Sequence, residues 1–61
     1  MNLNYLIGMQ EADAIAAIKA AGMRPRVTAR DGENYMLTAD YRTDRINLCI
    51  KNGMVVRADI G

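Results

Sequence analysis

The chain is organised around one charged run, which reads Thr38-Ala39-Asp40-Tyr41-Arg42-Thr43-Asp44-Arg45. The polar segment Asp31-Gly32-Glu33-Asn34 precedes it, and the alternating apolar run Ile46-Asn47-Leu48-Cys49-Ile50 follows it directly. A segment with this much charge is ordinarily flexible, but here a strand anchors its end and two arginines lie within reach of it. We therefore expect an exposed loop, from Asp31 to Asp44, that is held rigid and presented to a partner.

The segment after this loop predicts a β-hairpin. Residues 45–51 alternate between apolar and polar side chains, so that Ile46, Leu48 and Ile50 share one face. Asn52-Gly53 is the strongest short hairpin signal, because a type I′ turn needs positive φ at both positions. Residues 54–60 form the returning strand, and one side of it is expected to carry Met54, Val56, Ala58 and Ile60.

The segment before the loop predicts a helix and one more strand. Residues 10–21 are rich in alanine, the best helix former, and Gly22 is placed to end the helix in a left-handed conformation. The N-cap is weak, since Gln10 stands where Ser, Thr, Asp or Asn is preferred. The expected buried face of this helix carries Ala14, Ile15, Ile18 and Ala21.

The residues around this helix complete the expected core. Residues 3–7 read as an entry segment that lays Leu6 and Ile7 on the core, and Pro25 opens a strand that continues to Arg30. In the first half of the loop, the apolar side chains expected to pin it to the core are Tyr35, Met36 and Leu37.

These elements predict a single α+β domain spanning residues 1–61. The strands on either side of the long loop are expected to pair in parallel, with the loop as the crossover, and the C-terminal strands form an antiparallel hairpin. One helix packed on this small mixed sheet gives a two-layer architecture with a long exposed loop.

Composition excludes several classes of function. At 61 residues the chain is too small for a deep catalytic cleft, and it contains neither histidine nor serine to build a nucleophile–base pair. We therefore expect no enzyme, no cofactor and no metal site. The net charge is +1 without a basic cluster, which argues against nucleic-acid binding.

Cysteine count and hydropathy limit the setting of the protein. The one cysteine, Cys49, cannot form an internal disulfide, so the fold is disulfide-free and needs no oxidising compartment. No segment is long enough to span a membrane, and the N-terminal residues lack the features of a secretory signal. We expect a monomer, cytoplasmic unless a signal segment was removed.

The run from Asp40 to Ile46 resembles the reactive-loop signature of the potato inhibitor I family of serine protease inhibitors, which includes eglin-like and barley subtilisin-inhibitor proteins. It is most similar to the bacterial and fungal elastase-inhibitor relatives, in which an aspartate-tyrosine-arginine run leads to an arginine, a leucine or isoleucine, and an asparagine. Leu6-Ile7-Gly8 and Gly61 also match the family pattern, so the resemblance covers nearly the whole chain.

The resemblance implies a reversible, substrate-like inhibitor of an elastase- or subtilisin-like serine protease, with Ala39–Asp40 as the reactive bond. Ala39 would enter the primary specificity pocket, preceded by Thr38, and Asp40 and Tyr41 would lie on the leaving side. In the family, arginines on the following strand hydrogen-bond back to the loop on both sides of this bond.

Three residues of this chain are candidates for such loop support. The resemblance gives Arg45 the first of the two arginine positions and places Asn47 where plant members carry the second. From the residues themselves, the fork-shaped guanidinium of Arg45 is expected to reach acceptors on Thr38 and Asp40. Arg42 either helps in this or touches the enzyme.

A second interpretation stays open. The same fold also suits a non-inhibitory protein-binding module, possibly intracellular, that uses the loop or an open sheet edge to hold a partner. The free thiol of Cys49 favours this alternative, whereas the intact Asp-Tyr-Arg-x-Asp-Arg run favours the inhibitor.

Overall fold

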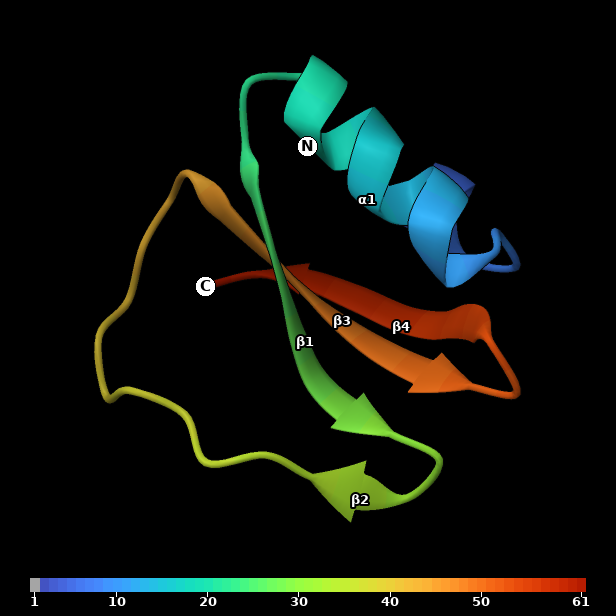
Figure 1. The fold of residues 1–61 in the computed structure, drawn as a ribbon. Coiled ribbons are helices and arrows are strands. Elements are labelled where there is room, and N and C mark those ends of the chain that lie inside the picture. Colours follow the sequence, from blue (N-terminus) through green and yellow to red (C-terminus); the bar gives the residue numbers. More distant parts are fainter. Residues whose placement is uncertain (1) are drawn as a thin grey trace.

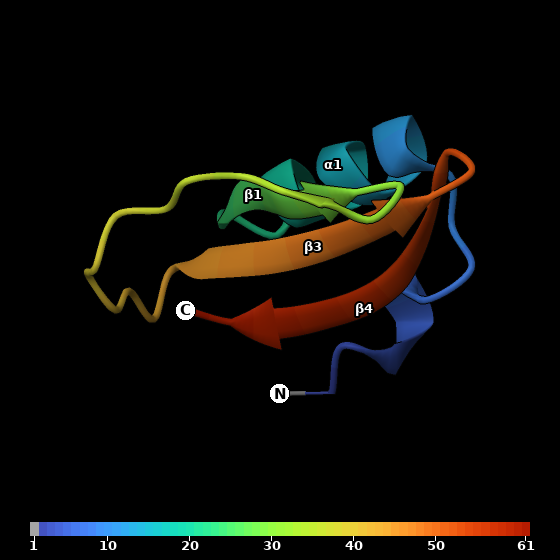
Figure 2. The same ribbon diagram turned by 90° about the horizontal axis from the view of Figure 1, so that it is seen from below.

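A computed structural model describes residues 2–61 of the chain. One helix packs on one face of a four-stranded mixed sheet with strand order β2-β1-β3-β4, as Figures 1 and 2 show. The α+β two-layer architecture predicted from the sequence is therefore confirmed. The elements in chain order are η1 (Asn4–Leu6), α1 (Glu11–Ala20), β1 (Arg24–Arg30), β2 (Glu33–Asn34), β3 (Arg45–Lys51) and β4 (Met54–Ile60).

Helix α1 lies where the alanine-rich segment predicted it, one residue shorter at each end. Gln10 adopts an extended conformation at the N-cap and its side chain makes no capping hydrogen bond, as its residue type indicated. Gly22 follows the helix with φ +78°, the left-handed conformation that ends it. Because the helix stops at Ala20, Ala21 is exposed rather than part of the buried face.

The sheet joins one parallel pair to two antiparallel pairs. β1 runs parallel to β3, with Arg26 opposite Asn47 in the register, and the long loop is the crossover between these strands. β3 and β4 form the antiparallel hairpin that Asn52-Gly53 predicted, and both turn residues have positive φ.

The short strand β2 was not predicted. It pairs antiparallel with the end of β1 through a second tight turn, Asp31-Gly32, where φ is +53° and +83°. Asp-Gly is a hairpin signal of the same kind as Asn-Gly, so the sequence did contain the information. The expectation of an irregular loop starting at Asp31 was wrong, and the loop starts only after Asn34.

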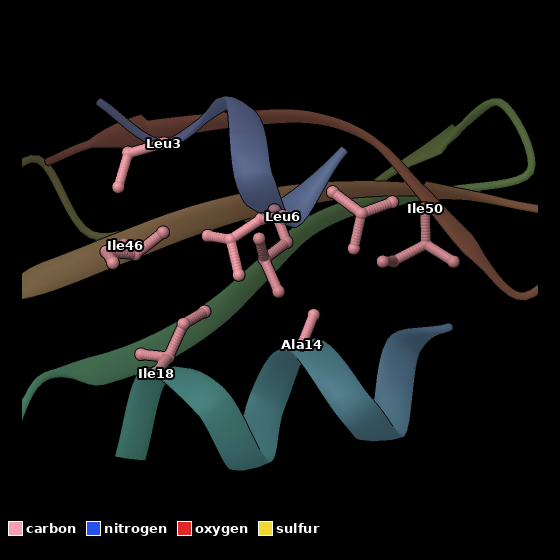
Figure 3. Close-up of a cluster of buried hydrophobic side chains, with 8 residues drawn as sticks. Leu3, Leu6, Ala14, Ile18, Ile46 and Ile50 are labelled. Atoms are coloured by element: carbon pink, nitrogen blue, oxygen red, sulfur yellow. The ribbon is translucent and has the colours of Figure 1, made fainter. Parts of the chain in front are cut away.

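The core lies between α1, η1 and the sheet, as Figure 3 shows. Leu6 is fully buried, but Ile7 is 44% exposed, so the expectation that both would enter the core holds only for Leu6. The short 3-10 turn η1 explains the difference, because it directs Leu3 and Leu6 inward together. The buried apolar residues are Leu3, Leu6, Ala14, Ile18, Ile46, Leu48, Ile50 and Val55.

A β-bulge corrects the prediction for β4. The register shifts between Cys49 and Ile50, which pair with Arg57 and Val55, so Val56 is an extra residue without a partner across the strands. As a result Val55 is buried, whereas Met54 and Val56, which strict alternation placed on one side with Ala58 and Ile60, are about half exposed.

Candidate functional site

The candidate site is the exposed loop of residues 35–44, which joins β2 to β3. Figure 1 shows it as a wide arc beside the sheet, with the C-terminus lying inside the arc. All of its residues from Met36 to Asp44 are exposed. Thr38, Ala39, Asp40 and Tyr41, the predicted protease-binding residues, therefore all lie at the surface.

The sequence led us to expect that three apolar residues attach the first half of the loop to the core. The structure does not show this attachment. Only Tyr35 is held: its backbone N–H donates to the Thr28 carbonyl at 3.1 Å, and its hydroxyl accepts a hydrogen bond from Arg30 at 3.1 Å. Met36 and Leu37 are exposed, because the chain leaves the sheet directly after Tyr35.

Arg45, the first residue of β3, connects the loop to the body of the protein. Its Nη2 donates to the backbone carbonyl of Asp40 at 2.8 Å and to that of Gly61 at 2.7 Å, and lies 3.4 Å from Asp40 Oδ1. Its side chain is only 11% exposed, so the charge-assisted hydrogen bond to Gly61 is buried and the contacts to Asp40 are partly buried. The loop is thus tied to the sheet immediately after the Ala39–Asp40 bond.

The Asp40 carboxylate gathers contacts from both sides of the same bond. The Thr38 hydroxyl donates to Oδ1, and Arg42 Nε donates to Oδ2 at 3.0 Å. These two hydrogen bonds, together with the guanidinium of Arg45, hold the pKa of the Asp40 carboxyl well below its ordinary value. An ionised Asp40 therefore links Thr38, Arg42 and Arg45 across the peptide bond on its N-terminal side.

Arg26 on β1 is a loop contact that sequence reasoning missed. Its Nε donates to Asn47 Oδ1 at 2.8 Å, and its Nη1 donates to Thr38 Oγ1 at 3.3 Å. Arg45 was expected to reach both Thr38 and Asp40, but it reaches only Asp40, and Arg26 binds Thr38 instead. Asn47 orients Arg26, and no hydrogen bond joins its side chain to a loop residue that the structure describes. The missing signal is the parallel register, which places Arg26 opposite Asn47.

Gly61 closes the site from the inside of the arc. Its carbonyl accepts hydrogen bonds from Arg45 Nη2 and from the Arg42 backbone N–H at 3.1 Å, and its own N–H donates to the Arg45 carbonyl at 3.0 Å. A Cβ at this position would lie 2.7 Å from Asn47 Nδ2. Glycine therefore lets the C-terminus lie close to Asn47, which binds Arg26, while its carbonyl binds Arg45.

One donor of this network lacks a partner. Nε of Arg45 is buried without a hydrogen bond to any residue in the range 2–61, while Nη2 of the same guanidinium has three acceptors. A buried unsatisfied donor typically costs about 1–3 kcal/mol. The position of Arg45 is therefore set by the loop and by Gly61 rather than by optimal satisfaction of its own donors.

A separate ion pair lies at the base of the loop. Arg30, at the end of β1, pairs with Glu11 of α1 through two hydrogen bonds, at 2.6 and 3.2 Å, and its remaining nitrogen reaches the Tyr35 hydroxyl. These contacts connect the first turn of the helix to the first residue of the loop. We call the side chains of Arg26, Arg42 and Arg45 the arginine brace and treat Arg30 as a separate contact.

The site displays a peptide bond at the surface. Residues 2–61 contain no pocket, no group of carboxylates and thiols that would hold a metal, and no helix long and apolar enough to cross a membrane. What the arrangement provides is the exposed Ala39–Asp40 bond, with one guanidinium hydrogen-bonded to Thr38, the residue before Ala39, and another to Asp40.

No family model matches the chain, and neither the curated proteins nor the solved structures contain a match to it.

Proposed function

We propose that this protein is a reversible, substrate-like inhibitor of an elastase- or subtilisin-like serine protease, with Ala39–Asp40 as its reactive bond. One observation carries the proposal: Arg26 holds Thr38 and Arg45 holds Asp40, so both flanks of one exposed peptide bond are tied to the sheet.

The arginine brace lowers the entropic cost of binding. A flexible substrate loses backbone and side-chain freedom when it enters a protease cleft, at about 1–2 kcal/mol for each residue whose backbone is fixed. A loop already held in the bound shape avoids much of that loss and binds more tightly for the same contacts. Here the hold comes from hydrogen bonds, since the single cysteine forms no disulfide.

The same brace opposes hydrolysis. The protease serine attacks the Ala39 carbonyl carbon and forms an ester. The bond to the Asp40 nitrogen breaks, and the amine of Asp40 takes up the proton that the serine hydroxyl has lost. In an ordinary substrate that amine diffuses away before water attacks the acyl-enzyme. Here Arg45 and Arg42 keep Asp40 beside the ester. Effective molarities for well-held groups reach about 10⁵ M or more, so resynthesis of the peptide bond competes with hydrolysis.

Ala39 indicates the class of protease. A methyl side chain fits a small or tolerant primary pocket, as in elastase-like and subtilisin-like enzymes, and offers no charge to a trypsin-like pocket. A single methyl contributes little binding energy of its own, so the inhibitor depends on the backbone and on other loop residues.

The test is titration against an elastase, a subtilisin and a chymotrypsin, with mass spectrometry to detect cleavage after Ala39. The proposal expects stoichiometric inhibition of at least one of the first two enzymes, and cleavage at Ala39–Asp40 that is slow or stops at an equilibrium. Rapid, complete cleavage there without inhibition would contradict it and favour the alternative, a non-inhibitory binding module on the same fold.

A further inference from the structure

Tyr35, the first residue of the exposed loop, is held at both its backbone and its side chain. Its N–H donates to the Thr28 carbonyl at 3.1 Å and extends the pairing of β1 with β2 by one residue. Its hydroxyl accepts a hydrogen bond from Arg30 Nη1 at 3.1 Å, and the Arg30 guanidinium carbon lies 5.8 Å from the centre of its ring. Only two residues, both exposed, separate Tyr35 from Thr38. Tyr35 is therefore a fixed stem for the acyl half of the loop.

Arg30 is aimed at Tyr35 by Glu11, the first residue of α1. Nε and Nη2 of Arg30 bind the two oxygens of the Glu11 carboxylate at 3.2 and 2.6 Å, which fixes the plane of the guanidinium and leaves Nη1 for the Tyr35 hydroxyl. The backbone N–H of Glu11 in turn donates to the Gly53 carbonyl at 2.8 Å. The Arg30 and Glu11 side chains are 42% and 27% exposed, so their ion pair adds little to stability, and its main effect is to orient Arg30. We call the side chains of Glu11, Arg30 and Tyr35 the stem clamp.

The arginine brace holds the two halves of the loop unequally. On the amine side, Asp40 is bound through its backbone carbonyl by Arg45, whose side chain is nearly buried, and through its carboxylate by Arg42. On the acyl side, the brace makes one exposed hydrogen bond of 3.3 Å, from Arg26 to Thr38. An exposed hydrogen bond of this length is weak, so the acyl half depends on a second fixed point. The stem clamp supplies that point.

Resynthesis of the reactive bond needs both chain ends in place. The Asp40 amine attacks the ester carbonyl carbon of Ala39, the peptide bond forms, the ester C–O bond breaks, and the proton lost by the amine goes to the serine oxygen. Hydrolysis is favoured when the new chain ends gain conformational freedom, and ends that stay held gain less. The effective concentration of one end near the other also falls as the free tether between them lengthens. Release of Tyr35 would lengthen the acyl tether back to Asn34, the end of β2.

We propose that the stem clamp positions the acyl half of the loop so that the cleaved reactive bond is remade. Tyr35 is the positioning residue, Arg30 holds it, and Glu11 acts through Arg30 from helix α1. The inference rests on the proposed function and deepens it, because it makes the helix part of the inhibitory device although the helix contributes no residue to the loop.

The test measures the equilibrium between intact and cleaved protein, approached from both sides with a catalytic amount of subtilisin. Tyr35→Phe removes only the hydroxyl, and we expect it to raise the ratio of cleaved to intact protein about three- to tenfold, as the loss of one hydrogen bond. Glu11→Gln should raise the ratio by a smaller factor, and a ratio equal to wild type would overturn the part played by the helix. A purely structural role for Tyr35 would lower the free energy of unfolding in urea and leave the ratio unchanged.

Tyr5→Phe is the matched control. Tyr5 is 55% exposed on η1, and its hydroxyl has no hydrogen-bond partner within the part of the chain that the structure describes. Its loss should change the ratio by less than about twofold.

NMR order parameters of residues 36–38 in the free protein separate this inference from the proposed function. If every protease tested cleaves wild type rapidly and completely, the proposed function fails. The stem clamp is then upheld by lower order parameters in Tyr35→Phe than in Tyr5→Phe, and overturned by equal ones. If the protein inhibits, an equal ratio of cleaved to intact protein in wild type and Tyr35→Phe overturns the inference while the proposed function stands.

Discussion

Arg26 on β1 lies opposite Asn47 on β3 and donates its Nε to the Asn47 side chain at 2.8 Å, which turns its remaining nitrogens toward the loop. Asn47 occupies the position where the resemblance to the potato inhibitor I family implies a second arginine. In the structure, Arg26 of the neighbouring strand β1 places its guanidinium against Asn47. The two flanks of the Ala39–Asp40 bond are thus held by arginines from two different strands.

Arg26→Ala should loosen the acyl side of the loop by a small amount. The Arg26–Thr38 hydrogen bond is exposed and 3.3 Å long, so its loss is expected to raise the rate of cleavage after Ala39 only severalfold. Arg24→Ala is the matched control, because Arg24 is on the same strand, is 72% exposed and, within residues 2–61, forms an ion pair only with Asp44, the last loop residue, at 3.8 Å. Equal cleavage rates for the two variants, measured by mass spectrometry, would rule out a role for Arg26.

Asn47→Ala should act in the same direction as Arg26→Ala, since Asn47 orients the Arg26 guanidinium. The two effects should not add, because both variants remove the same support. A double-mutant cycle on the cleavage rate measures this coupling. Additive effects would mean that Asn47 acts independently of Arg26.

The stability of the loop should depend on the ionisation of Asp40. Its pKa is depressed in the folded state, chiefly by the Thr38 hydroxyl and the Arg42 guanidinium, while in the unfolded chain it has an ordinary value of about 3.9. The folded state therefore binds fewer protons. The contribution of Asp40 is fully present above this ordinary value and is lost as the pH falls below it.

Urea unfolding of wild type and Asp40→Asn at several pH values measures this contribution. We expect wild type to be the more stable at pH 7, and the difference to shrink below about pH 4. Asp59→Asn, which changes an exposed carboxylate on β4, is the control for the change in net charge. A wild-type advantage that stays constant down to pH 2 would contradict the assignment.

Because of the β-bulge in β4, truncation to alanine should affect stability very differently at two adjacent valines. Val55 is buried at 1% exposure, so Val55→Ala should lower the free energy of unfolding by about 1.5 kcal/mol or more. Val56 is half exposed, and Val56→Ala should change it by less than about 0.5 kcal/mol. Denaturant titration of both variants checks the pair, and equal destabilisation would contradict the register.

The elements that the sequence predicted well are those specified locally. The alanine-rich helix, the Asn52-Gly53 turn and the alternation in β3 each depend on residues close together in the chain. Strand β2 was missed although its signal, Asp31-Gly32, is also local. Two other missed features depend on registers between strands. The bulge reverses the faces of Val55 and Val56, and the parallel pairing brings Arg26 to Asn47. Neither register can be read from a single segment.

The predictions for the candidate site can likewise be divided into those that local sequence specifies and those that need the fold. Its position, the exposure of Ala39 and Asp40 and the proximity of Arg45 could be predicted from the charged run and the strand after it. The expectation that Met36 would pack on the core was wrong. It followed from the rule that an apolar residue near a loop end is ordinarily buried. Only the positions of Tyr35 and Thr38 reveal that the chain between them lies outside the core.

The rate at which a subtilisin cleaves Ala39–Asp40 in Arg45→Ala, relative to wild type, tests the role of the arginine brace most directly. The partly buried, charge-assisted Arg45–Asp40 hydrogen bond is of a kind worth about 1.5–3 kcal/mol, so its loss should raise the rate roughly 10- to 100-fold while circular dichroism shows the fold retained. Arg57→Ala, at an exposed arginine on β4, should leave the rate unchanged. An Arg45→Ala protein that inhibits as strongly and is cleaved as slowly as wild type would contradict the account.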